Sequence, residues 1–111
     1  MASIIPSVER GGGGLIVLPL PYSDAVALTA STAKTYTFAL GTKFVIFDFS
    51  LGATDSVWAK SGVTAVIPAG DTTGGFSSFK VMSGVAYSVE NLVSISLVSS
   101  ANVVVNVQSY T

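Results

Sequence analysis

The chain has 111 residues, the size of one domain, and contains neither cysteine nor histidine. These absences exclude a disulfide framework, a thiolate nucleophile, a histidine general base and a Cys- or His-ligated metal, so we expect no cofactor. The net charge is only −1, and the few lysines and arginines are scattered along the chain. Nucleic acids and anionic membranes need clustered positive charge, so neither is an expected partner.

The polarity of the chain is unusual for a single domain. Half of the residues are hydrophobic and only 10% are charged, against about 25% charged in an average soluble domain. No apolar run reaches the roughly 18 residues that a membrane-spanning helix needs. Such a chain either covers its surface with Ser and Thr or buries part of that surface against neighbours. We expect both, and therefore self-association.

Residues 1–22 differ in composition from the remainder. Gly11–Gly14 form a glycine run, which predicts a hinge. An apolar stretch follows, with prolines that favour an extended path. We predict an N-terminal arm over residues 1–22 that docks on a neighbouring subunit, and a domain over residues 23–111. The alternative is a disordered tail followed by a first edge strand.

From residue 25 onward, alternating hydrophobic and polar residues predict β-strands. Ala25–Leu28 is a short strand. Lys34–Leu40 alternates so that Tyr36, Phe38 and Leu40 share one face. Lys43–Phe49 is apolar on both faces, which predicts a strand that is central or buried on both sides.

The second half continues the pattern. Ser56–Lys60 is a strand carrying Trp58, Val63–Ile67 follows a turn, and residues 68–75 form the longest predicted loop. After Phe79–Met82, the last two strands, Leu92–Val98 and Asn102–Gln108, are predicted to form a hairpin with one wet face. Seven to nine short strands without helical periodicity predict an all-β chain: a single β-sandwich or jelly-roll-like domain with an extended N-terminal arm.

Few residues could carry chemistry. Asp48 and Asp55 could be paired as in glycosidases, and Asp71 could join a calcium site, but all three are better explained as turn formers. We therefore expect no catalytic residues and no enzyme. Trp58 is either an anchor in the core or an interface, or a platform for sugar binding with Tyr36 or Tyr87 nearby. The candidate site is an interface made of Leu15, Ile16, Val17, Leu18, Leu20 and Trp58.

The order of motifs in residues 40–111 supports a resemblance covering about two thirds of the chain. The motifs are Phe47-Asp48-Phe49, Val57-Trp58-Ala59-Lys60, the Pro/Asp/Gly segment Val66–Gly74, Leu92–Val98 and Val103-Val104-Val105. In this order they resemble small phage virion structural proteins of the β-sandwich type.

That resemblance implies location in the virion and a role as a capsid decoration or cement protein. The implied partners are the major capsid protein or other virion proteins. Two alternatives remain open: an adaptor in the neck, tail or fibre of the virion, and a carbohydrate-binding adhesin module.

Overall fold

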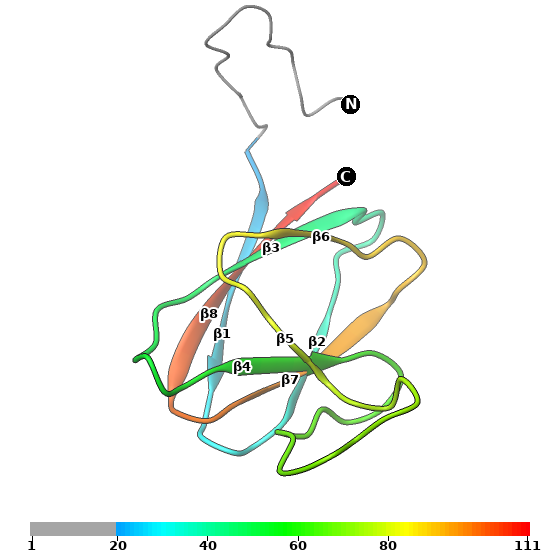
Figure 1. Cartoon of the computed structure of the whole chain (residues 1–111). Coiled ribbons are helices and arrows are strands. Elements are labelled where there is room, and N and C mark those ends of the chain that lie inside the picture. The colour runs from blue at the N-terminus through cyan, green and yellow to red at the C-terminus, as the bar shows by residue number, and fades with distance from the viewer. Residues whose placement is uncertain (1–19) are drawn as a thin grey trace, which may run out of the picture.

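A computed structural model describes residues 20–111, which form eight β-strands in two four-stranded antiparallel sheets (Figure 1). The described residues contain no helix that is long and apolar enough to cross a membrane. The all-β prediction is confirmed. The strands are β1 (Tyr22–Leu28), β2 (Lys34–Thr37), β3 (Phe44–Asp48), β4 (Val57–Lys60), β5 (Phe79–Lys80), β6 (Ala86–Ser88), β7 (Ser94–Ser99) and β8 (Val103–Tyr110).

The strand order shows how the chain is wound. Sheet A has the order β1-β8-β3-β6 and sheet B the order β2-β7-β4-β5. The first four strands pair with the last four in reverse: β1 with β8, β2 with β7, β3 with β6 and β4 with β5, all antiparallel. The chain is thus one long hairpin rolled into two facing sheets, which is the jelly-roll arrangement.

The core lies between the two sheets and follows the two-residue period of the strands. In sheet A, Val45 and Phe47 of β3 point inward beside Val105 and Val107 of β8, and all four side chains are buried. The inward residues of sheet B, among them Leu97, pack against them. Strand β3 lies between β8 and β6, as predicted for a central strand, although its outward side chain Phe44 remains exposed.

The predicted hairpin between the last two strands is wrong. Strand β7 pairs with β2 and β4 in sheet B, whereas β8 pairs with β1 and β3 in sheet A. Six of the seven connections cross from one sheet to the other, and only β4–β5 stays within its sheet. Each strand has one apolar face, and consecutive strands bury these faces by facing each other across the core.

Two local predictions also fail. Leu40 does not share the inward face of Tyr36 and Phe38, because β2 ends at Thr37 and a turn begins. Residues Val63–Ile67 form no strand; they belong to a connection over residues 61–78 that is longer than predicted, and β6 was not expected at all. The alternating pattern therefore identified most strands but not their ends.

Candidate contact surface

The antiparallel winding gives the sandwich two different ends. The connections β1–β2, β3–β4, β5–β6 and β7–β8 meet at one end, which we call the loop end. The connections β2–β3, β4–β5 and β6–β7 meet at the other. The start of β1 and the C-terminus also lie there, since Tyr22 is opposite Ser109 (Figure 1).

Hydrogen bonds from serine side chains and from the backbone link the loops of the loop end. The backbone N–H of Ser56 donates to Ser100 Oγ over 2.9 Å, and this hydroxyl donates to the carboxylate of Asp55 over 3.0 Å. The N–H of Ser31 donates to the carbonyl of Ser99 over 2.7 Å. The β1–β2, β3–β4 and β7–β8 connections are thereby linked to one another.

Ser83 links the fourth connection in the same way. The N–H of Phe49 donates to Ser83 Oγ over 3.0 Å, and that hydroxyl lies 3.3 Å from a carboxylate oxygen of Asp48. Asp48 and Asp55 thus each face a serine of a neighbouring loop. This agrees with their interpretation as turn formers.

The opposite end presents the most exposed leucines of the described residues. The turn Ala39–Thr42 is closed by a bond from the N–H of Thr42 to the carbonyl of Ala39, and Gly41 has a φ of 83°. Leu40, at the corner of this turn, is fully exposed (102%). The neighbouring turn after β6 leads into Val93, which is 75% exposed.

The two turns border a hollow of about 300 Å³ whose lining includes Leu40, Leu92 and Val93. Two charged residues of opposite sign, Lys43 and Glu90, also line it. The exposed apolar side chains of the two turns, together with those on the adjacent strands, form a surface that we call the apolar end: Leu20, Tyr22, Leu40, Phe44, Leu92 and Val93.

A second hollow, also of about 300 Å³, opens where the two sheets separate between β5 and β6. Its aromatic residues are Phe47, Phe79 and Tyr87, whose ring centroids lie 6.1 Å (Phe47–Tyr87) and 5.6 Å (Phe79–Tyr87) apart. Leu92 lines this hollow as well as the one at the apolar end. We call the hollow between β5 and β6 the aromatic hollow, and its lining residues are Phe47, Ser61, Phe79, Tyr87, Ser88, Val89, Leu92 and Ile95.

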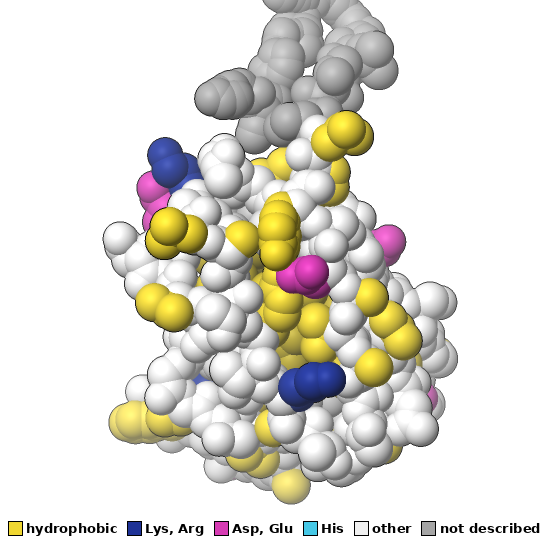
Figure 2. Space-filling model, turned by 180° about the vertical axis from the view of Figure 1, so that it is seen from behind, with side chains coloured by type: hydrophobic (Ala, Val, Ile, Leu, Met, Phe, Trp, Pro, Cys, Tyr) yellow, Lys and Arg dark blue, Asp and Glu magenta, His cyan; other side chains and the backbone are white. Residues whose placement is uncertain are grey.

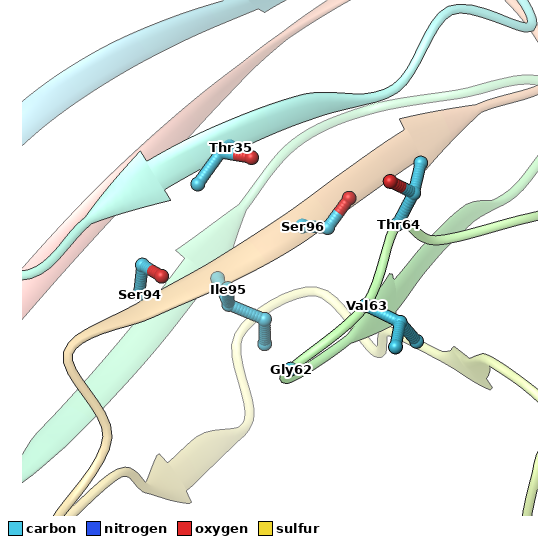
Figure 3. Close-up of a pocket in the computed structure, with 7 residues that line it drawn as sticks. All are labelled: Thr35, Gly62, Val63, Thr64, Ser94, Ile95 and Ser96. Carbon is cyan, nitrogen blue, oxygen red and sulfur yellow. The ribbon is translucent and has the colours of Figure 1, made fainter.

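A third hollow, of about 280 Å³, is lined mainly by hydroxyl groups (Figure 3). Thr35, Ser94 and Ser96 project from the neighbouring strands β2 and β7, and Thr64 faces them from the loop after β4. Such hydroxyls can exchange hydrogen bonds with water or a polar ligand, but none of the lining residues titrates near neutral pH. Trp58 is not among them, so the structure does not assemble a sugar-stacking site here.

The 61–78 connection folds back over the outer face of sheet B. The N–H of Ala65 donates to Ser96 Oγ over 2.9 Å, and both residues are buried, as is Val98. Trp58 lies on this face, paired with Val98 and Lys80 across the neighbouring strands, and is half-buried. The structure thus places Trp58 in sheet B, away from the apolar end.

A partly buried hydrogen bond joins the two sheets at the edge formed by β1 and β2. The phenol of Tyr36 donates to the carboxylate of Asp24 over 2.6 Å. Burial, and then this hydrogen bond, raise the pKa of Tyr36 to about 12. The ammonium group of Lys34 donates to the carbonyl of Ala27 over 3.4 Å at the same edge.

The predicted interface is only partly visible. Leu15, Ile16, Val17 and Leu18 lie outside the described residues. Leu20 is 97% exposed at the apolar end, and Trp58 lies on the other sheet, so these two do not form one surface.

Sequence reasoning missed Leu40, Leu92 and Val93, because it placed Leu40 on a strand face with Tyr36 and Phe38, and Leu92 and Val93 within a strand. The glycine after Leu40 is the signal that could have revealed a turn corner there.

Charged side chains are sparse on the surface. Seen from behind, hydrophobic groups form a column down the middle of the molecule, with few acidic or basic groups around it (Figure 2). Within residues 20–111, no three His, Cys, Asp or Glu side chains gather where they could hold a metal ion. Comparisons with protein-family models, curated proteins and solved structures found no match.

Proposed function

We propose that this chain is a structural protein of a phage virion that decorates or cements the capsid through repeated subunit contacts. The observation that carries the proposal is the apolar end. Leu20, Leu40 and Val93 are at least 75% exposed there in the part of the chain that the structure describes. Apolar side chains gathered at one end of a domain mark a contact surface more often than scattered ones do.

The fold is compatible with this role. Jelly rolls form viral capsid domains, but they also form lectin domains and cupins, so the fold by itself does not assign a function. The argument from the fold is one of analogy. The argument from the surface is physical, because exposed leucine and valine at one end gain free energy when a neighbour covers them.

The magnitude of that gain favours repeated contacts over a single strong one. Fully burying a leucine or valine side chain contributes about 1.5–3 kcal/mol, so three of them contribute on the order of 5–9 kcal/mol. Association costs about 4–15 kcal/mol in lost rotational and translational freedom. A lone contact of this size is therefore weak, whereas many copies bound side by side on a symmetric shell reinforce one another.

The proposal predicts attachment that tolerates salt, since only two charged side chains, Lys43 and Glu90, line the hollow that Leu40, Leu92 and Val93 share, and their charges are opposite. Quantitative mass spectrometry of purified particles of the virus that encodes the chain would test it. Copies on the order of a hundred or more per particle support capsid decoration. About six to twelve copies would indicate the neck or tail instead. Absence from the particle contradicts the proposal.

A matched pair of variants links attachment to the apolar end. Leu40→Ser with Val93→Ser should lower the number of bound copies. Val104→Ser should not, although Val104 is 59% exposed, because it lies on the outer face of sheet A near the loop end. Equal occupancy of the two variants would show that another surface makes the contact.

A further inference from the structure

We propose that Asp24, Tyr36 and Ser109 form one hydrogen-bonded chain across the core that clasps the first strand, β1, to both sheets. The phenol of Tyr36 donates to Asp24, and the hydroxyl of Ser109 donates in turn to the phenol oxygen. This clasp is a conformational device, because it sets how readily β1 opens from the remainder of the sandwich. The inference goes beyond the proposed function and does not depend on it.

The strand register brings the three side chains together at one end of the core. Asp24 lies opposite Val107 of the neighbouring strand β8, and Ser109 lies two residues beyond Val107. Val107 is fully buried between the sheets, so the two-residue period turns Ser109 inward as well. Tyr36 reaches them from β2 in the facing sheet. Three polar groups from three strands therefore meet among apolar neighbours.

The bond between Tyr36 and Asp24 forms the first half of the clasp. The phenol donates to the carboxylate over 2.6 Å, which is within the range of short, charge-assisted hydrogen bonds. Tyr36 is only 8% exposed, and its ring packs edge-on against Phe38 with the centroids 5.7 Å apart. This packing holds the phenol oxygen in one place, where a second group can be positioned against it.

Ser109 supplies the second half. Its side chain is buried, and its hydroxyl has no partner of ordinary hydrogen-bond geometry within the described residues. Most buried hydroxyls do have a partner, so this one requires an explanation. Burial and the bond to Asp24 raise the pKa of Tyr36, whereas Ser109 lowers it. A neighbour that donates to a phenol oxygen has this effect, so Ser109 is placed to donate to Tyr36 after a small adjustment of its side chain.

The clasp lies toward the less buried beginning of β1. At the far end of the strand, Leu28 is buried, and the loop that follows is pinned because the N–H of Ala30 donates to Asn102 Oδ1 over 2.8 Å. At the beginning, Tyr22 is 59% exposed, and Asp24 is the inward residue that bonds to the facing sheet. Opening of β1 should therefore start at this end, where the clasp resists it.

Removal of the serine hydroxyl distinguishes a working clasp from an unused polar group by the sign of its effect. If Ser109 donates to Tyr36, Ser109→Ala removes a hydrogen bond and loosens β1. If the hydroxyl has no partner, the same change removes an unsatisfied buried group and leaves β1 as stable as before or more so.

Native-state hydrogen exchange of the full chain near neutral pH measures this opening. Ser109→Ala and Tyr36→Phe should each accelerate exchange of the β1 amides about fivefold, which corresponds to the loss of one ordinary hydrogen bond. The N–H of Val66 is held by Ser78 Oγ in the 61–78 connection. Its local opening leaves the clasp intact, so its exchange rate should stay within about twofold.

The double variant Ser109→Ala with Tyr36→Phe tests whether the serine acts through the phenol. Both changes break the same chain, so the β1 amides should exchange within about twofold of the rate in Tyr36→Phe alone. Ser23→Ala is the matched control, because Ser23 bonds to Asn106 on the outer, exposed face of the same two strands. It should change exchange in β1 by no more than about twofold.

A spectroscopic readout reports on the inferred bond directly. The ¹³C resonance of Tyr36 Cζ responds to hydrogen bonding at its oxygen, so it should move in Ser109→Ala and stay in place in Ser23→Ala. Circular dichroism establishes that each variant is folded. Unchanged or slower exchange of β1 in Ser109→Ala overturns the clasp, and so does an unchanged Tyr36 resonance. An acceleration of the same size in the Tyr36→Phe background overturns it too, because Ser109 would then act on another group.

Discussion

The two ends of this sandwich use their residues in opposite ways. At the loop end, Ser83 and Ser100 satisfy backbone and carboxylate groups of neighbouring loops. At the apolar end, the Thr42 hydroxyl donates to the carbonyl of Ala39 within the same turn, and the side chains of Leu40 and Val93 point into solvent. The serine hydroxyls link one loop to the next, whereas the side chains of Leu40 and Val93 contribute little to the stability of the domain.

The difference suggests that some side chains serve the folding of the domain and others serve its association with other chains. A side chain that contacts its own domain is constrained by stability, whereas a fully exposed leucine costs solubility and returns nothing to the isolated fold. We infer that the loop end holds the jelly roll closed and that the apolar end serves contacts with other chains. The following predictions test that division, beginning with the largest expected effect on stability.

Removal of the serine ties should destabilise the domain. The double variant Ser83→Ala and Ser100→Ala leaves the N–H groups of Phe49 and Ser56 without their hydroxyl acceptors. The two sites share no hydrogen-bond partner, so their costs should add to about 2 kcal/mol. Urea denaturation of the single and double variants measures this. A loss below about 0.5 kcal/mol would mean that the loop end is not tied by these side chains.

Alkaline pH should weaken the link between the sheets at the β1–β2 edge. The pKa of Tyr36 is raised to about 12 in the folded chain, against an ordinary value of 10.0. The unfolded chain therefore loses this proton first as pH rises. The stabilisation is complete below pH 10 and is lost between about pH 10 and 12.

The control for that effect is Tyr36→Phe, which removes the hydroxyl and its bond to Asp24. This variant should be about 1 kcal/mol less stable near neutral pH and should lose stability less steeply above pH 10. The comparison cancels the titration of the other tyrosines and the lysines. Parallel unfolding curves for the two proteins across this range would contradict the prediction.

The 61–78 connection should loosen without unfolding the sandwich when its anchor is removed. Ser96→Ala leaves the buried N–H of Ala65 without its acceptor, which should cost about 1 kcal/mol. Hydrogen exchange should then accelerate at Ala65 and Val66 but not at Val105 in the core. Uniform acceleration at all three positions would show that the connection and the sandwich unfold together.

The smallest effect on stability is expected at the apolar end. Leu40→Ser should change the free energy of unfolding by no more than about 0.5 kcal/mol, because the side chain is fully exposed. The same variant should weaken self-association. A clear loss of stability in dilute, monomeric protein would break the comparison, since it would show that Leu40 packs within its own chain.

Much of the architecture follows from the sequence alone. The two-residue alternation predicts that Tyr36 and Phe38 share one face, because period two is a local property of an extended backbone. Both side chains are buried in the core, as are Val105 and Val107, which follow the same period. The absence of helical periodicity and the number of strands are likewise local properties. They are sufficient for the class of fold and for a sandwich or jelly roll.

The tertiary structure decided which strands pair and which side chains stay uncovered. The pattern in β7 and β8 is as compatible with a hairpin as with two facing sheets, and only long-range pairing to β1, β2, β3 and β4 distinguishes them. Leu40 continues the alternation of β2 in sequence, yet the strand ends before it. Its exposure depends on what the remainder of the chain places nearby, and a local pattern carries no information about that.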